Sequence, residues 1–193
     1  MSTFPEIHWQ LPDWVANLVD GWTDELETEA GRMRLAIALA RNNIEEGTGG
    51  PFGAAVFDLT SHKLLAPGVN LVTRVLSSSA HAEIVAISVA QQLTGQFDLS
   101  AAGRYELVSS AEPCAMCLGA VPWSGVIRVV CGACAADAEA VGFDEGDRPA
   151  QWIDTLTARG IEVQTEVERE LARGVLEDYA AGGGAIYNGR QAS

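Results

Sequence analysis

PCAMC at residues 113–117 places two cysteines three positions apart, and CGAC at residues 131–134 is the other such motif in the chain. RYELVSS (residues 104–110) reads as a strand that ends shortly before PCAMC, and good helix formers continue as far as Pro122, with Pro113 expected at the first helical position. The motif therefore marks a junction between a strand and a helix, as in an α/β fold. Its thiols could belong to disulfides, a closed zinc site of four cysteines, a redox centre, or a metal site that needs another ligand.

Three elements are expected upstream of this junction. Apolar residues recur at spacings of three and four between Thr23 and Glu46, which predicts an amphipathic helix. FGAAVFDL (residues 52–59) and KLLAPGVN (residues 63–70) flank a short polar turn and predict an antiparallel hairpin. A buried helix is expected to begin near Ala80, after the capping hydroxyls of Ser77–Ser79.

Downstream of the junction, VIRVVCGA (residues 126–133) is apolar and β-branched, which predicts a central strand. A crossover of about thirty residues follows, long enough for a parallel pairing. It contains an expected helix at residues 149–160 and leads to a short strand at residues 161–167. A last helix is expected from about Glu168 to Ala181.

The length of 193 residues suits one domain. We expect an arm of residues 1–22 with a short helix around DWVANLVD, followed by a single domain of residues 23–193. The alternation of strands and helices predicts a three-layer α/β/α sandwich.

Charge and hydropathy exclude several classes of partner. The net charge of −14 and the pI near 4.4 oppose binding to nucleic acid or to anionic membranes. No run approaches the ~18 uninterrupted apolar residues of a membrane span, and the first residues do not resemble a secretory signal. A cytoplasmic location is therefore the expectation, and in that reducing compartment cysteines indicate metal binding or catalysis more often than disulfides.

A third metal ligand decides between a closed and an open zinc site. A structural zinc site takes four protein ligands, whereas a catalytic site takes three and keeps one position for water. CGAC could complete a site of four cysteines, but only thirteen residues separate Cys117 from Cys131, and they include the hydrophobic strand VIRVV. HAE offers His81 at the start of a helix, with Glu83 two residues later in a place suited to general acid/base catalysis. H-x-E followed by P-C-x-x-C is the signature of zinc-dependent nucleobase deaminases.

Longer stretches around these motifs carry a family resemblance. The chain resembles the cytidine deaminase-like superfamily in the stretches GGPFGAAVF, HAEIVAI and SSAEPCAMCLGAVPWSGV. It resembles the bacterial zinc-dependent guanine deaminases more specifically in PCAMCLGAVPWSGV, AEAVGFDEG and AIYNGR. The resemblance runs from about Arg32 to Arg190. It implies a five-stranded mixed sheet with the two metal-bearing helices adjacent on one face, and one zinc ion per subunit.

The resemblance also implies roles for individual residues. His81, Cys114 and Cys117 would bind zinc, and Glu83 would shuttle protons. Glu145 of GFDEG would lie near the leaving amino group. The residues implied to bind the substrate are Asn70, Phe52, Ala82, Trp123 and Tyr187, and the segment of residues 182–193 would cap the site.

Other interpretations of these residues stay open at this point. Asn70 is also suited to a hairpin turn, Glu145 to a solvated loop, and Trp123 to a core wall. Cys131 and Cys134 are expected to be buried as small apolar side chains.

The expected reaction is hydrolytic deamination of guanine to xanthine and ammonia. Alternatives are a transfer-RNA adenosine deaminase, which the acidity of the chain opposes, and a cytosine or amino-triazine deaminase. A non-enzymatic alternative is an interaction module stabilised by zinc on four cysteines. Because Tyr187 ends a glycine-rich segment that could cross an interface, a homodimer is expected, with or without exchange of the C-terminal segments.

Overall fold

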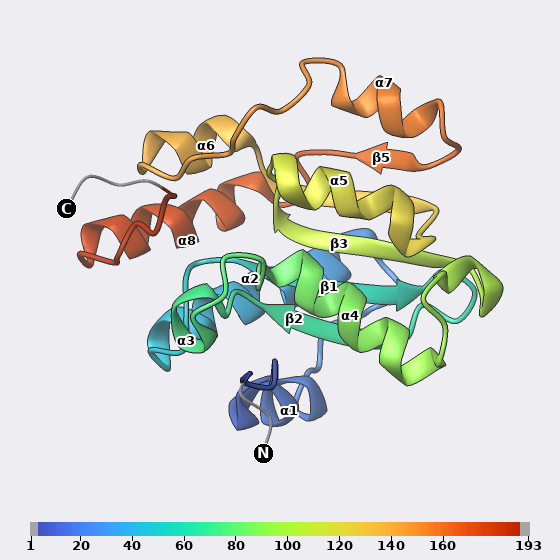
Figure 1. The fold of residues 1–193 in the computed structure, drawn as a ribbon, viewed down its shortest axis with the longest axis horizontal. Helices are drawn as coiled ribbons and strands as arrows, with labels where there is room; N and C mark the ends of the chain where they lie inside the picture. Colours follow the sequence, from blue (N-terminus) through green and yellow to red (C-terminus); the bar gives the residue numbers. More distant parts are fainter. Residues whose placement is uncertain (1–3, 190–193) are drawn as a thin grey trace.

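A mixed five-stranded sheet forms the centre of the molecule in the computed structural model, which describes residues 4–189 (Figure 1). Its strand order is β2-β1-β3-β4-β5. β1 is antiparallel to both β2 and β3, whereas β3, β4 and β5 run parallel. The strands are β1 (Gly53–Asp58), β2 (Leu64–Val69), β3 (Tyr105–Ala111), β4 (Arg128–Ala133) and β5 (Glu162–Gln164). The expected hairpin, the parallel crossover and the mixed sheet are confirmed.

Helices cover both faces of this sheet, which confirms the expected three-layer sandwich. α2 (Glu29–Glu45) and α8 (Arg169–Ala181) contribute to one apolar core, and α4 (Ala82–Thr94), α5 (Ala115–Ser124) and α7 (Trp152–Thr157) contribute to the other. The two helices that begin at the HAE and PCAMC motifs therefore share a face, as Figure 1 shows in green and yellow. The short helices are α1 (Asp13–Asp20), α3 (Val72–Val75), η1 (Leu99–Ala101) and α6 (Ala135–Ala140).

Glycines on the first two strands let helices approach the sheet closely. A Cβ atom at Gly53 would lie 2.3 Å from the carbonyl oxygen of Ala36 in α2, and one at Gly68 would lie 2.3 Å from that of Ala82 in α4. Only residues without a side chain fit these crossings. The close packing fixes the start of α4, and hence His81, against the end of the hairpin.

Part of the segment expected to form an arm, residues 9–22, contributes to the same core as α2. α1 forms where DWVANLVD predicted a helix, and its Val15 is 2% exposed within the core shared with α2 and α8. The indole nitrogen of Trp14 donates a hydrogen bond of 3.1 Å to the Thr48 hydroxyl. The first three residues of the expected arm lie outside the described residues.

Several helix boundaries differ from the sequence predictions for local reasons. α2 begins at Glu29 and not at Thr23, because the Thr28 hydroxyl accepts a hydrogen bond from the Gly31 amide and caps the helix. The hydroxyls of Ser77 and Ser79 pair with each other and do not cap α4.

The second metal-bearing helix also starts and ends later than predicted. Cys114 occupies the N-cap of α5, so Pro113 precedes the helix and is not its first residue. The helix continues through Pro122 to Ser124. α6 was not predicted, and β5 is shorter than the expected strand at residues 161–167.

A buried ion network ties α2 to the sheet. Glu106 on β3 is fully buried, and its carboxylate contacts the guanidinium groups of Arg32 and Arg128. Arg32 also donates to the carbonyl oxygens of Leu26 and Glu27 before α2 begins. The network satisfies the buried charges and holds the entry to α2 against the sheet.

Candidate active site

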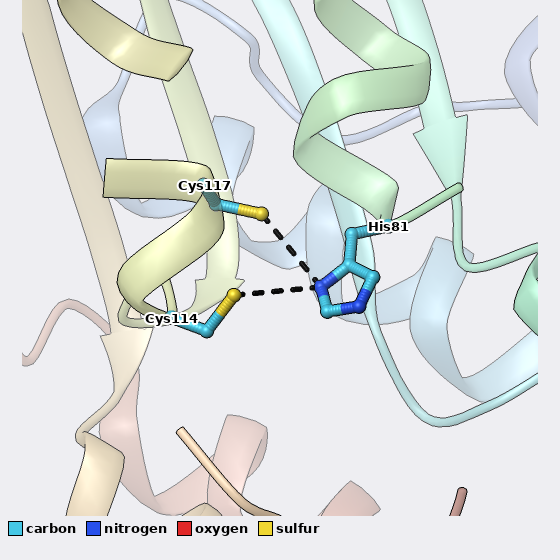
Figure 2. A group of neighbouring side chains, drawn as sticks. All are labelled: His81, Cys114 and Cys117. Atoms are coloured by element: carbon cyan, nitrogen blue, oxygen red, sulfur yellow. Dashed lines mark hydrogen bonds between the residues drawn. The ribbon is translucent and has the colours of Figure 1, made fainter. Parts of the chain in front are cut away.

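The sulfur atoms of Cys114 and Cys117 converge on the imidazole of His81, as Figure 2 shows. Nδ1 of His81 lies 3.6 Å from Sγ of Cys114 and 3.7 Å from Sγ of Cys117. His81 is the N-cap of α4 and Cys114 the N-cap of α5, so neither position needs a helical backbone. Within residues 4–189, this is the one group of three His, Cys, Asp or Glu side chains whose potential metal-ligand atoms all lie within 4.8 Å of one another.

The geometry of this group fits zinc. A tetrahedral zinc ion about 2.0 Å from a histidine nitrogen and about 2.3 Å from a cysteine sulfur holds those two atoms about 3.5 Å apart. The distances between the imidazole nitrogen and the two sulfurs match that separation. One imidazole and two thiols make a three-ligand set, which leaves a fourth position for water or substrate.

The two thiols share a proton unequally. The pKa of Cys114 is lowered to about 4, first by its hydrogen bond with Cys117 and then, against burial, by its hydrogen bond with His81. The pKa of Cys117 is raised by the same contact with Cys114, by burial and by the charge of Glu83. Burial alone would lower the pKa of His81, but the contact with Cys114 and nearby carboxylates raise it. Since a bound cation replaces a shared proton, this cluster is suited to a metal that binds thiolates.

A cavity of about 340 Å³ opens beside the metal cluster, and residues from six separate segments line it. His81, Cys114 and Glu83 reach it from the starts of α4 and α5. Its other walls come from the loop after β2, the loop after α6 and the C-terminal segment. The lining residues are Phe52, Asn70, Val72, Ser78, His81, Glu83, Glu112, Cys114, Ala115, Met116, Phe143, Asp144, Glu145, Gly146, Tyr187, Asn188 and Gly189.

Glu83 is buried at the cavity wall, with only 6% of its surface exposed. Burial, followed by the charge of Cys114, raises its pKa to about 7. A carboxyl group with a pKa near neutrality can both accept and donate a proton at physiological pH, which is what general acid/base catalysis requires.

Glu145 is a second buried carboxyl in the cavity. Burial, followed by the charges of Cys114 and Glu83, raises its pKa to about 8. Its Oε2 atom has no hydrogen-bond partner among residues 4–189, whereas its backbone carbonyl accepts a bond of 2.9 Å from the amide of Ala115 in α5. The alternative of a solvated loop carboxylate is therefore wrong for Glu145, because the residue is buried and lines the cavity.

Asn70 follows the last residue of β2 and is 1% exposed. Its Oδ1 atom accepts a bond of 3.2 Å from the amide of Val72, which is the turn role that the sequence also suggested. Its Nδ2 atom is buried without a hydrogen-bond partner in the part of the chain that the structure describes. An unpaired buried amide is costly, so a ligand in the cavity would gain from accepting its hydrogen bond.

Aromatic rings form the apolar side of the cavity. Phe52 and Phe143 meet edge to face with ring centroids 4.9 Å apart, and Tyr187 meets Phe143 at 5.3 Å. The Tyr187 hydroxyl is buried, has no hydrogen-bond partner among the described residues, and lies against Gly50. Phe52 and Tyr187 thus lie where the resemblance implied, while residues 190–193 of the expected cap lie outside the described residues.

Trp123 and Ala82 do not line this cavity. Because α5 continues past Pro122, Trp123 projects into solvent with 84% of its surface exposed, beside a separate groove between α5 and α7. This exposure contradicts both predictions for Trp123, a wall of the substrate pocket and a position in the core. Ala82 is fully buried in the core between α4 and the sheet.

The second CxxC motif does not take part in the metal cluster. Cys131 is fully buried within β4, as expected of a small apolar side chain. Cys134 is only partly buried and caps α6, with its sulfur 3.2 Å from a carboxylate oxygen of Asp137. The alternative of zinc held by four cysteines is therefore wrong for this chain.

Several lining residues were not predicted from the sequence, among them Glu112, Phe143 and Asn188. Glu112 directly precedes PCAMC, so its position beside the metal ligands could have been noticed. Phe143 and Asn188 lie inside GFDEG and AIYNGR, two stretches that carry the resemblance, but the roles predicted for these stretches fall on Glu145 and Tyr187.

The chain matches the family described as the cytidine and deoxycytidylate deaminase zinc-binding region over residues 26–133. It is 36% identical over 125 residues to guanine deaminase from Bacillus subtilis strain 168, which covers 62% of this chain and 77% of that protein. The solved guanine deaminase from Nitrosomonas europaea is 45% identical with a TM-score of 0.85, over 94% of this chain and 98% of that one. A variant of the protein NE0047 crystallised with 8-azaguanine is also 45% identical with a TM-score of 0.85, over 94% and 99% of the two chains. No helix among the described residues is long and apolar enough to cross a membrane.

Proposed function

The chain belongs to the family of the cytidine and deoxycytidylate deaminase zinc-binding region, and from this membership we propose that it hydrolyses guanine to xanthine and ammonia. The family makes it a zinc-binding hydrolytic deaminase. The observation that carries the choice of substrate is the set of unpaired buried polar atoms around one cavity beside the metal cluster. The similarity to guanine deaminases over most of the chain supports the same substrate.

His81, Cys114 and Cys117 would hold the zinc ion. When bound there, zinc supplies a Lewis acid that lowers the pKa of water toward neutrality. The helix N-termini that carry His81 and Cys114 favour the ionised thiolates.

Glu83 moves the protons of the reaction in this proposal. Its carboxylate takes a proton from the attacking water as the water oxygen bonds to C2 of guanine, and delivers that proton to N3. The proton of the new hydroxyl then passes through Glu83 to the amino nitrogen. The C–N bond breaks, ammonia leaves and the C2 carbonyl of xanthine forms. Because Glu83 is buried, bulk water is kept away from both proton transfers. Burial also raises the pKa of Glu83 to about 7, close to the pH at which the enzyme works.

Glu145 and Asn70 bind the purine edges in this proposal. The unpaired Oε2 of Glu145 would accept from the amino group and help to protonate it as it leaves. The unpaired Nδ2 of Asn70 would donate to an acceptor on the ring. Phe52 and Tyr187 would enclose the flat faces and edge of the base, together with Phe143.

A free base suits the cavity better than a nucleic acid. Glu83, Glu112, Asp144 and Glu145 line it, and the whole chain carries a net charge of −14. The negative charge of the chain would repel phosphates, which argues against a transfer-RNA substrate.

We also propose that the enzyme acts in the cytoplasm as a homodimer, with residues 1–22 as an arm, residues 23–193 as the deaminase domain and residues 182–193 as its cap. Tyr187 closes over the cavity of its own chain in the structure. Exchange of the capping segments between two copies would place the same ring over the partner's cavity. Light scattering, with cross-linking of the C-terminal segment, distinguishes a dimer with exchange from one without it.

A substrate panel tests the proposed reaction. Ammonia release is measured with zinc-loaded protein on guanine, adenine, cytosine and an amino-triazine, alongside the zinc content. We expect guanine to give the highest kcat/KM. Guanine proving inert while another base turns over would reject the substrate and keep the reaction class, and no turnover of any of these bases would remove the support for catalysis on nucleobases.

A further inference from the structure

Asn188 joins two segments that both line the cavity. Its Oδ1 atom accepts a hydrogen bond of 2.9 Å from the amide of Asp144, and its Nδ2 atom donates one of 2.8 Å to the carbonyl of Gly142. Both partners are backbone groups of the loop that carries Glu145. One carboxamide thus pairs with this loop through both of its polar atoms.

The loop also has attachments of its own. The amides of Gly142 and Phe143 donate to the carbonyls of Glu139 and Ala138 in α6, and the Phe143 ring is buried in the apolar core. Glu145 is held to α5 through the bond between its carbonyl and the amide of Ala115. The Asp144 carboxylate accepts from the amide of Gly146 and closes a tight turn. Gly142 and Gly146 have positive φ angles of 104° and 69°, so the loop bends sharply at both ends of the stretch that presents Glu145.

The C-terminal segment has a separate attachment to the domain. The Tyr179 hydroxyl in α8 donates a bond of 2.7 Å to the carbonyl of Ala185. From there the segment reaches the cavity, where the Tyr187 ring packs on Phe143. The segment is therefore fixed at one end by α8 and at the other by the loop.

From these contacts we propose that the Asn188 carboxamide clasps the C-terminal segment to the loop of residues 142–146, so that closure of the segment over the cavity and placement of the Glu145 carboxyl occur together. Asn188 is then a positioning residue that acts through Glu145. This inference rests on the proposed function for the role of Glu145, whereas the mechanical coupling itself does not.

The chemistry of asparagine suits this role. A primary amide offers an acceptor and a donor side by side, and it can therefore satisfy an amide and a carbonyl of the same loop. Aspartate keeps the acceptor and shape but cannot donate when ionised, and it would add a charge beside Asp144 and Glu145. Alanine removes both bonds.

Hydrogen–deuterium exchange on the zinc-loaded protein tests the coupling without reference to activity. In Asn188→Ala we expect exchange to rise about ten-fold in residues 182–189 and also in residues 142–147, the change that two ordinary hydrogen bonds produce in an opening equilibrium. In Asn188→Asp we expect a rise in both segments as well. Exchange in β3 reports whether the core is intact.

Asn42→Ala is the matched control. The Asn42 side chain also donates to a backbone carbonyl, that of Ala38, at 2.9 Å, but it lies on α2. Exchange in residues 142–147 should not change in this variant. Unchanged exchange of that loop in both Asn188 variants would overturn the clasp, and so would opening of the C-terminal segment alone.

Steady-state kinetics on guanine add a second readout. Loss of a group that acts in the transition state lowers kcat and kcat/KM together, whereas loss of a simple lid contact raises KM alone. We expect kcat of Asn188→Ala to fall about ten-fold, in line with the loop opening. A rise in KM with unchanged kcat would reject the link to Glu145. Inactivity of the unsubstituted enzyme on guanine, with coupled exchange retained, would reject the proposed substrate and leave the clasp.

Discussion

Nδ1 of His81 lies 3.6 Å from Sγ of Cys114 although the two residues are 33 positions apart in the chain. Each residue is the N-cap of its helix, and the two helices lie on the same face of the sheet. The metal cluster therefore forms where the N-termini of α4 and α5 meet. Both helices pack on the sheet, and this packing holds their N-termini in place. This arrangement explains why three ligands converge without a fourth from Cys131 or Cys134.

The first prediction concerns the metal. His81→Ala removes one of three ligands, so after dialysis the zinc content should fall from about one ion per chain to a small fraction of that. Cys131→Ala should keep its zinc, because Cys131 is buried in β4 outside the cluster. Zinc content is measured by atomic emission. Loss of zinc from the Cys131 variant would contradict the three-ligand site.

The second prediction separates metal binding from proton transfer. Glu83→Gln keeps the size of the side chain but cannot take up a proton, so kcat should fall by at least ~10²-fold while zinc content stays unchanged. Ammonia release and zinc content are measured on the same preparation. Undiminished turnover by the zinc-loaded variant would discard the role assigned to Glu83.

The third prediction concerns the buried ion network of the sheet. Glu106→Gln leaves the guanidinium groups of Arg32 and Arg128 without their buried carboxylate, and it should lower the free energy of unfolding by about 3–5 kcal/mol. Asp24→Asn is the matched control, because it breaks an exposed pair with Arg34 and should cost less than about 1 kcal/mol. Urea denaturation measures both changes. Equal costs for the two variants would show that the buried network contributes little.

The fourth prediction concerns acid stability. The hydrogen bond from Arg169 lowers the pKa of Asp137 to about 2, against the effect of burial. Since the folded-state pKa lies below the unfolded value, this carboxylate contributes stability that is present above about pH 4 and is lost as the pH falls toward 2. Asp137→Asn should lack that part of the acid dependence, whereas both proteins lose metal ligands to protonation alike. Unfolding free energies are compared between the two proteins across this range, and parallel curves would contradict the prediction.

The sheet and the metal cluster could be predicted from the sequence because their signals are local. The apolar strands with their turn, and the HAE and PCAMC motifs, each lie within a short stretch of sequence. Other features depend on contacts in the folded structure that cannot be read from a short stretch of sequence. AADAEA has no apolar periodicity, yet it forms α6, with Cys134 and Asp137 closing its first turn. The direction of Trp123 depends on α5 continuing through Pro122, and Asn188 pairs with backbone groups, which leave no pattern in the sequence.

The fifth prediction tests how Tyr187 closes the cavity. A Cβ atom at Gly50 would lie 1.8 Å from the Tyr187 hydroxyl and 2.6 Å from the ring carbon that bears it, so Gly50→Ala cannot coexist with the closed ring. The ring should swing out, hydrogen exchange in residues 184–189 should rise, and KM for guanine should increase by about ten-fold, the equivalent of one modest contact. Gly119→Ala is the control, because a Cβ atom there meets nothing within 4 Å. Tyrosine fluorescence quenching and steady-state kinetics follow the change. If Gly50→Ala binds guanine as tightly as the unsubstituted protein and its C-terminal segment stays protected, Tyr187 does not form the wall of the cavity.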